Sequence, residues 1–336
     1  MNLHIKILFL LLLCGSFLQA QPVVAPPQSG PVLITGATAH LGNGEVIENA
    51  YIAFDEGKLT QVSASAISTN GYQVIDASGK HVYPGFIAPN TQMGLIEIGG
   101  VRATRDASEV GNLNPNVRSL IAYNTDSDII PTARAVGVLL AQPTPTSGRI
   151  PGTSAIVQLD AWNWEDAAYK AEDGVHLDWP SRFRYPRWWL GETGYQKSDN
   201  YDEQTHELEV LFSEAKAYDT KSNPEQTNVK LEAMKGLFDG SKKLYIHANS
   251  AKDIMESALF AKRFGASPVI VGGNEAWMVT DFLVENEVPV ILDDTQRLPS
   301  RVDYDIDQPF KIAKQLEDAG VLYSFSMSGT WQIRNL

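Results

Sequence analysis

The stretch that decides the fold is HVYPGFIAPNTQMGLIEI, residues 81–98. Apolar strand formers surround a Pro84-Gly85 pair, which predicts a buried strand bounded by a turn at its start. The strand ends in the polar triplet 90–92, where Asn90 and Gln92 stand two positions apart. Strands that bind a metal at their end often carry two histidines at this spacing. Here both positions carry amide side chains, so the first question is whether the chain is still an enzyme.

Bulk composition places the chain among ordinary globular proteins. It has 336 residues, of which 43% are hydrophobic and 20% charged, and its formal net charge is −13. This length allows one large α/β barrel or two medium domains, with a hydrophobic core large enough to be stable without disulfide bonds. An acidic chain without a basic run is a poor ligand for nucleic acid or for an anionic membrane surface, so we expect neither partner.

The first twenty residues, MNLHIKILFLLLLCGSFLQA, predict a secretory signal peptide. A lysine precedes an apolar run that is too short to span a bilayer comfortably, and Ala20 offers a cleavage site. Cys14 is the one cysteine, so the mature chain would contain no disulfide and would rely on its core. We therefore expect a periplasmic or secreted protein without a membrane anchor, with a flexible lead-in over residues 21–30.

The next segment, PVLITGATAHLGNGE (residues 31–45), superficially resembles a phosphate-binding loop. A dinucleotide site needs a helix directly after this loop to present its N-terminus to the pyrophosphate. The sequence instead alternates apolar and polar residues around a Glu56-Gly57 turn, which predicts a β-hairpin. We therefore expect a small β unit over residues 31–81 and no nucleotide cofactor.

The remainder, residues 82–336, alternates apolar runs with amphipathic stretches, as an α/β barrel does. Continuous apolar runs are typical of parallel strands that are covered on both faces. Counting the opening strand, eight are expected, the number of a (β/α)8 TIM-like barrel, and the other seven are residues 136–143, 154–160, 174–179, 243–250, 267–273, 288–294 and 321–327. Helical spacing predicts helices at residues 251–265, 275–287 and 309–320.

The turn Asp76-Ala77-Ser78-Gly79-Lys80, followed by the segment 84–87 (PGFI), resembles the amidohydrolase superfamily, in particular its imidazolonepropionase-like branch. The resemblance spans roughly residues 31–336 and implies a barrel preceded by a small β-sandwich unit. It also implies hydrolysis of carbon–nitrogen bonds other than peptide bonds, in cyclic amides or amidines. Members of the family normally continue beyond the last strand, so we expect the fold to be incomplete at the C-terminus.

The resemblance implies five metal ligands, and the sequence keeps one of them. His247 matches the histidine after the fifth strand. Asn90 and Gln92 replace the histidine pair, a glycine at 272–273 replaces the histidine after the sixth strand, and Ser328 or a neighbour replaces the aspartate after the eighth. Amide oxygens are weak ligands for zinc-like metals and glycine offers no side chain. The divalent metal that the family implies therefore lacks most of its ligands.

Other polar residues at strand ends are alternative site candidates. Asp293 and Asp294 follow the seventh strand, where a carboxylate pair can act as general acid and base without a metal. Alternatively, these acids cap the next helix or bind Arg297 or Arg301. The candidate substrate-binding residues are Asn90, Gln92, Asn274, Ser328, Trp162 and Trp164.

Residues 161–204 form an aromatic insertion that contains five of the seven tryptophans. Such a segment suits a lid over a small-molecule site or an interface with a second, homologous barrel. It equally suits a satellite core packed over the barrel.

Two functions of different classes follow. The first is an exported amidohydrolase-type enzyme with an altered or partial metal site around His247. The second is a catalytically silent relative that binds a ligand or pairs with an active homologue through its Trp-rich insertion. A metal-free carboxylate hydrolase is a third hypothesis.

Overall fold

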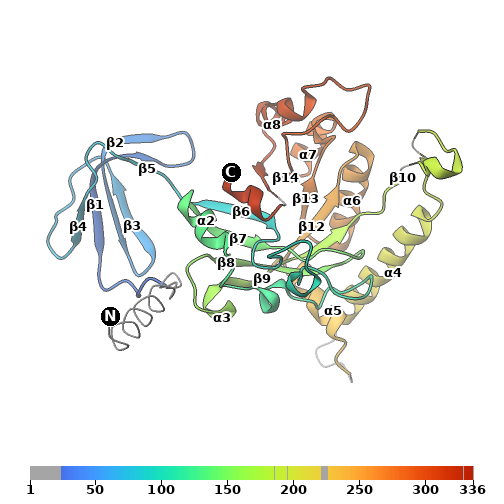
Figure 1. Cartoon of the computed structure of the whole chain (residues 1–336), viewed down its shortest axis with the longest axis horizontal. Coiled ribbons are helices and arrows are strands. Elements are labelled where there is room, and N and C mark those ends of the chain that lie inside the picture. The colour runs from blue at the N-terminus through green and yellow to red at the C-terminus, as the bar shows by residue number, and fades with distance from the viewer. Residues whose placement is uncertain (1–23, 185, 195, 221–225, 328, 336) are drawn as a thin grey trace, which may run out of the picture. The chain divides into compact units, whose positions relative to one another are not determined.

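The structure is a computed structural model that describes residues 24–184, 186–194, 196–220, 226–327 and 329–335. The chain divides into two compact units, the first ending at Phe86 and the second beginning at Ile87 (Figure 1). The expected signal peptide and residues 21–23 of the lead-in lie outside the described residues. Among the described residues, no helix is both long and apolar enough to cross a membrane.

The first unit is a five-stranded sheet with the order β3-β2-β1-β4, in which β5 also pairs with β1. Its strands are β1 (Val32–His40), β2 (Val46–Asp55), β3 (Lys58–Ser63), β4 (Gln73–Asp76) and β5 (His81–Val82). The predicted hairpin is confirmed: β2 and β3 are antiparallel, and Glu56 and Gly57 form the turn with positive φ angles of 48° and 72°. Because a strand follows β1, the nucleotide-binding alternative is excluded there.

The second unit contains an eight-stranded sheet with the order β15-β14-β13-β12-β9-β8-β7-β6, as the predicted barrel requires. Its strands are β6 (Phe86–Thr91), β7 (Val138–Pro143), β8 (Gly152–Gln158), β9 (Ala168–Asp178), β12 (Lys243–Ala248), β13 (Pro268–Gly272), β14 (Val290–Leu292) and β15 (Tyr323–Phe325). The α/β class and the eight strands are therefore confirmed.

One part of the barrel prediction is wrong, because β8 runs antiparallel to both of its neighbours, β7 and β9. Strands β9, β12, β13, β14 and β15 are parallel, as expected. The physical reason lies in the connections, residues 144–151 and 159–167, which are too short for the crossover that parallel neighbours need. The fourth strand is also longer than expected and divides the aromatic segment 161–204 into two parts.

Helices surround the strands. The α-helices are α2 (Ile129–Ala135), α3 (Trp164–Ala167), α4 (Tyr201–Asp219), α5 (Val229–Met234), α6 (Ala251–Phe264), α7 (Thr280–Glu285) and α8 (Gln308–Ala319). The 3-10 helices are η1 (Arg102–Thr104), η2 (Ser119–Ala122), η3 (Trp188–Leu190), η4 (Lys235–Leu237), η5 (Ala276–Met278) and η6 (Trp331–Asn335), and a small hairpin comprises β10 (Phe183–Arg184) and β11 (Gln196–Lys197). The helix expected at 275–287 is split between η5 and α7, and α4 was not among the expected helices.

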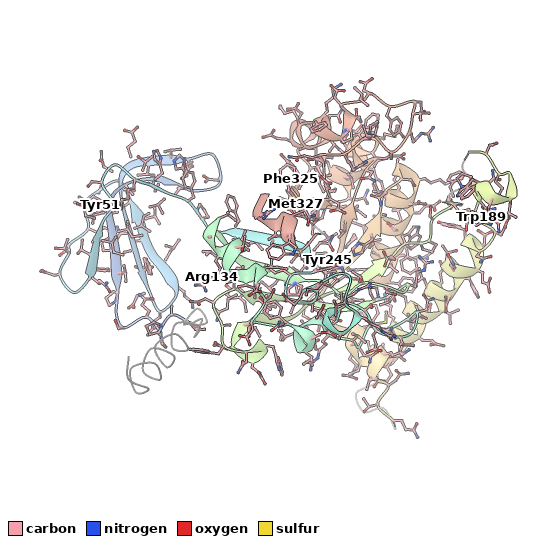
Figure 2. The ribbon with its side chains drawn as sticks, in the orientation of Figure 1. Tyr51, Arg134, Trp189, Tyr245, Phe325 and Met327 are labelled. Carbon is pink, nitrogen blue, oxygen red and sulfur yellow. The ribbon has the colours of Figure 1, made fainter. Side chains whose placement is uncertain are left out.

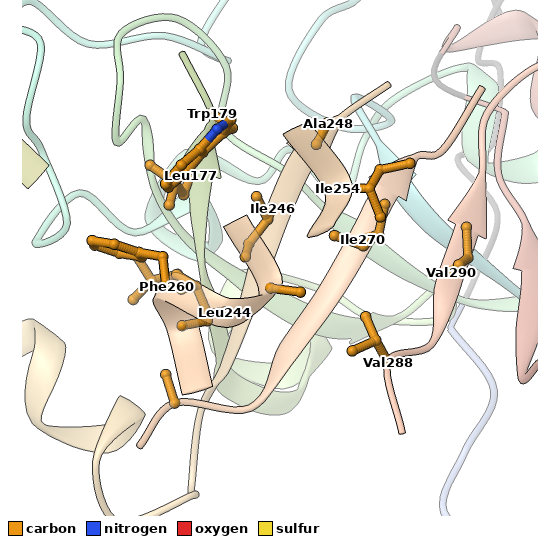
Figure 3. Close-up of a cluster of buried hydrophobic side chains, with 14 of the residues drawn as sticks. Leu177, Trp179, Leu244, Ile246, Ala248, Ile254, Phe260, Ile270, Val288 and Val290 are labelled. Atoms are coloured by element: carbon orange, nitrogen blue, oxygen red, sulfur yellow. The ribbon is translucent and has the colours of Figure 1, made fainter. Parts of the chain in front are cut away.

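Helix α6 shows how the sequence sets an element. Ser250 caps its N-terminus by accepting a hydrogen bond from the Asp253 amide, and Gly265 ends it with a φ of +87°. The buried face of α6 packs on β12 and β13 through Ile254 and Phe260 (Figure 3).

The alternation of β12 decides which residues face the inside of the barrel. Leu244, Ile246 and Ala248 point outward into the main core with the helices (Figure 3). Tyr245 packs in a separate inner cluster with side chains of β13 and β14 (Figure 2). Because successive side chains of a strand point to opposite faces, His247 points inward like Tyr245.

Candidate active site

A pocket of about 570 Å³ opens where β9, β12 and β13 end. These are the C-terminal ends of parallel strands, the usual location of chemistry in a barrel. Residues that follow each strand line it, and they include Trp179, His247, Asn249, Asn274 and Glu275. Phe183, from the β10–β11 hairpin, contributes an aromatic edge.

His247 forms the inner part of this pocket and is hydrogen-bonded to a second histidine. Its Nε2 lies 3.0 Å from Nδ1 of His176, which is completely buried on β9. Burial lowers the pKa of both imidazoles, and for His176 the neighbouring His247 lowers it further. Both rings are therefore neutral at pH 7.

Two carboxylates lie beside His247. Asp178 is its register partner on β9, and Asp293 follows β14 and accepts a hydrogen bond from Ser326 Oγ at 3.3 Å. Both oppose the effect of burial on His247, since their negative charges raise its pKa. Burial raises the pKa of Asp178 itself, while His247 and Arg149 act in the opposite direction.

Arg149 holds the Asp178 segment in place from the β7–β8 connection. Its guanidinium donates to the Asp178 carbonyl at 2.5 Å and to Gln204 Oε1 at 2.8 Å. Burial lowers the pKa of Arg149, and the charges of Asp178 and Glu207 raise it.

A buried polar network supports the histidine pair from below. The His176 ring stacks on Tyr245, with centroids 4.8 Å apart, and Tyr245 donates to Asp173 Oδ2 at 2.5 Å. Gln142 Nε2 donates to the same oxygen at 3.0 Å, and Gln142 Oε1 accepts from the Asn90 amide at 3.0 Å. The network fixes the Tyr245 ring, and the stack on Tyr245 in turn orients the His176 imidazole.

The structure places the predicted amide residues in different surroundings. Asn90 is buried at the end of β6 with a φ of +48°, a conformation that Asn tolerates better than most residues, and it joins the network through its backbone. The Gln92 carbonyl accepts from the amides of the next turn. Asn274 lines the pocket and accepts a hydrogen bond from Arg297.

The two adjacent aspartates have separate roles. Asp293 lies beside His247, whereas Asp294 is exposed and accepts from the Gln296 amide at 2.9 Å within a turn. Arg297 also donates to the Asp294 carbonyl. The Asp294 carboxylate therefore stabilises a turn and its carbonyl binds Arg297, whereas the alternative prediction had the carboxylate cap a helix or bind an arginine. Ser328 lies outside the described residues.

The structure does not bring Trp162 and Trp164 to the pocket. Both lie in the connection between β8 and β9, at the start of β9, whereas the pocket is at its end. Because β8 is reversed, the loop after it lies at the other end of the barrel from His247. Trp162 is largely exposed there, and Trp164 packs partly buried on a core cluster.

The residues at the family's ligand positions do not fit a metal. His247 Nε2 is bonded to His176, and Gly272 and Gly273 adopt φ angles of +98° and +62°. A Cβ at Gly272 would lie 2.5 Å from Asn249 Oδ1, so a histidine there would strain the backbone and require the Asn249 side chain to move. Over the described ranges, no three His, Cys, Asp or Glu side chains are grouped to hold a metal ion.

Sequence reasoning missed His176, Asp178 and Arg149. A signal for the first two was available, because GVHLDW places His176 and Asp178 two residues apart and therefore on one face of a strand. Arg149 lies in a connection, and no periodicity marks such a residue.

Comparison with known proteins supports the same architecture. No protein-family model matches the chain. An amidohydrolase from Thermotoga maritima MSB8 superposes with a TM-score of 0.74 at 21% identity, over 88% of this chain and 78% of that one. The barrel has the amidohydrolase fold.

Part of the chain is also similar in sequence to a known enzyme of this fold. The imidazolonepropionase of Caldanaerobacter subterraneus subsp. tengcongensis is 32% identical over 101 residues. The match spans 23% of this chain and 24% of that enzyme, about a quarter of its length. The predicted resemblance to the amidohydrolase superfamily is therefore confirmed.

Proposed function

We propose that the chain is a hydrolase of carbon–nitrogen bonds other than peptide bonds, in small cyclic amides or amidines, that works without the family's metal ligands. The observation that carries the proposal is the position of His247 at the pocket, between the carboxylates of Asp178 and Asp293. Acid–base groups in a partly desolvated cleft at the ends of barrel strands are the arrangement that hydrolysis requires.

The two carboxylates suit opposite proton transfers. Asp293 is only partly buried and is the candidate base that takes a proton from the attacking water. Asp178 has a pKa raised by burial and is the candidate acid for the leaving nitrogen. His247 lies between them, where it contacts the reacting group. The water adds its oxygen to the carbonyl or amidine carbon, and the carbon–nitrogen bond breaks as the nitrogen accepts a proton.

A substrate screen with matched variants tests this function. Hydantoins, lactams, amidines and N-acylated amines are incubated with the purified chain, and release of amine, ammonia or carboxylate is measured. We expect Asp293→Asn to lose roughly 100-fold or more of kcat, in line with a general base. Asp294→Asn, a change at the exposed neighbour, should retain activity, and chelators should have no effect. Equal losses in both variants, or inactivation by a chelator, would contradict the proposal.

A second function has its own supporting observation. Trp188 and Trp189 are 78% and 64% exposed between β10 and β11, and Trp189 is labelled in Figure 2. Phe183 of β10 lines the pocket. Exposed tryptophans are characteristic of binding surfaces. On this alternative, the chain binds its ligand without turnover and pairs with an active homologous barrel.

The alternative predicts no turnover with any compound of the screen. It also predicts a complex with a homologous barrel from the native host that Trp188→Ser and Trp189→Ser abolish. Turnover that depends on Asp293 would exclude it.

We also propose that the protein is exported, on the basis of the signal-like residues 1–20. Expression of the full chain should yield a mature protein that begins at Gln21, which N-terminal sequencing of the exported fraction would establish. Retention of residues 1–20 on a protein that stays in the cytoplasm would refute export.

A further inference from the structure

The hydrogen bond between His176 and His247 allows two proton arrangements. In the first, His176 donates from Nδ1 to Nε2 of His247, and the second proton of the neutral pair lies on His247 Nδ1. In the second, His247 donates from Nε2, and the other proton lies on His176 Nε2. The two arrangements give the pocket opposite chemistry, because His247 presents an N–H donor in the first and a bare nitrogen in the second.

The burial of His176 favours the first arrangement. Its Nε2 is fully buried and has no hydrogen-bond partner among the described residues. A proton on this atom would create an orphaned N–H group in the barrel interior, and buried N–H groups are very rarely left unpaired in proteins. The stack on Tyr245 keeps the ring from turning to find another partner.

The charges around His247 favour the same arrangement. Asp178 and Asp293 act on the imidazole of His247 from two sides, through β9 and β14. A bare nitrogen lone pair facing two carboxylates is repelled by them, whereas an N–H dipole is attracted. Arg149 lies beside Asp178 and moderates its charge, but its guanidinium bonds are to the Asp178 backbone and to Gln204.

We infer that His176 fixes His247 as a neutral hydrogen-bond donor, with its proton on Nδ1, so that the pocket recognises a neutral ligand through an acceptor oxygen such as a carbonyl. His176 is then a positioning residue that never touches the ligand. Nδ1 of His247 makes no hydrogen bond to the described residues, so it is available to the pocket that the ring lines. The role of that oxygen as the carbonyl under attack rests on the proposed function, whereas the protonation state does not.

Nuclear magnetic resonance of the resting protein tests the protonation state without any turnover. The full chain is labelled with 15N-histidine, and His247→Gln and His176→Phe assign the two rings in long-range 1H–15N spectra at pH 7. We expect a pyrrole-type Nδ1 and a pyridine-type Nε2 on His247 in the wild type. The reverse pattern, or a doubly protonated ring, would overturn the inference.

The His176→Phe variant and a small probe extend the test. Without the donor, the His247 nitrogens should show averaged shifts, because neither protonation state is then fixed. N,N-dimethylacetamide, a neutral compound that accepts hydrogen bonds and donates none, should shift the Nδ1 resonance of the wild type saturably. An unchanged His247 pattern in His176→Phe would refute the role of His176, and no saturable effect of N,N-dimethylacetamide would refute the ligand class. Either result leaves the substrate screen as an independent measure of turnover.

Discussion

The completely buried histidine of β9 makes the stability of the barrel depend on pH. Burial holds the pKa of His176 well below 6.5, so the folded protein keeps this ring neutral as the pH falls. The unfolded chain takes up a proton near pH 6.5, and so it binds more protons than the folded chain below that pH. The stability is therefore fully present above pH 6.5 and is lost as the pH falls.

The size of the effect follows from proton linkage. A histidine that stays neutral in the folded state costs about 1.4 kcal/mol per pH unit below its unfolded pKa, or about 2 kcal/mol at pH 5. Replacement of His176 by Phe removes the titrating group and keeps an aromatic ring on Tyr245. The free energy of unfolding of His176→Phe should therefore fall less than that of the wild type between pH 7.5 and pH 5, by up to about 2 kcal/mol, the value for a ring that stays neutral over the whole range.

Urea unfolding at four or five pH values, followed by tryptophan fluorescence, measures the difference. His206→Gln is the matched control, because it removes a histidine that is exposed on α4 and leaves His176 in place. The reasoning fails if wild type and His176→Phe lose stability in parallel, since His176 would then be protonated in the folded state or exposed by local opening.

Three further predictions concern other parts of the barrel. Tyr245→Phe removes the 2.5 Å hydrogen bond to buried Asp173 and should lower the free energy of unfolding by about 1–3 kcal/mol, measured by urea titration; an unchanged midpoint would show that the bond is replaced. Gly272→Ala should lower the melting temperature more than Gly240→Ala, because a Cβ at position 272 would contact Asn249 Oδ1. Gly240 also has a positive φ, but nothing lies within 4 Å of a Cβ there, so equal shifts in melting temperature would exclude the clash. Each change carries the left-handed backbone cost of about 1–2 kcal/mol. Elemental analysis of the chain purified without chelators should find no near-stoichiometric zinc, iron or manganese, and a stoichiometric ion would mean that ligands come together differently.

The strands of the barrel could be predicted from the sequence because each is marked by a run of neighbouring apolar residues. Apolar runs such as residues 267–273 and 288–294 identify buried strands whatever their direction. The direction of β8 cannot be inferred from its own residues. It follows from the connections 144–151 and 159–167, because both are shorter than the crossover that two parallel neighbouring strands need.

The candidate site was predictable only in part. His247 and Asp293 were found because each lies at the C-terminal end of a recognisable strand. The hydrogen bond of His247 to His176 joins residues 71 positions apart, and a spacing along the chain cannot reveal it. The role of the tryptophans was misjudged because one continuous aromatic segment, residues 161–204, contains a strand that sends its two halves to opposite ends of the barrel.

The two glycines at the end of β13, Gly272 and Gly273, restrict which substitutions could introduce a metal ligand there. The backbone at Gly272 and Gly273 has positive φ angles, and Asn249 occupies the space that a side chain at Gly272 would need. A histidine introduced there strains the backbone and has to displace the Asn249 side chain at the same time. A search for gain of metal binding in this barrel should therefore vary residues 247–249 and 271–274 together.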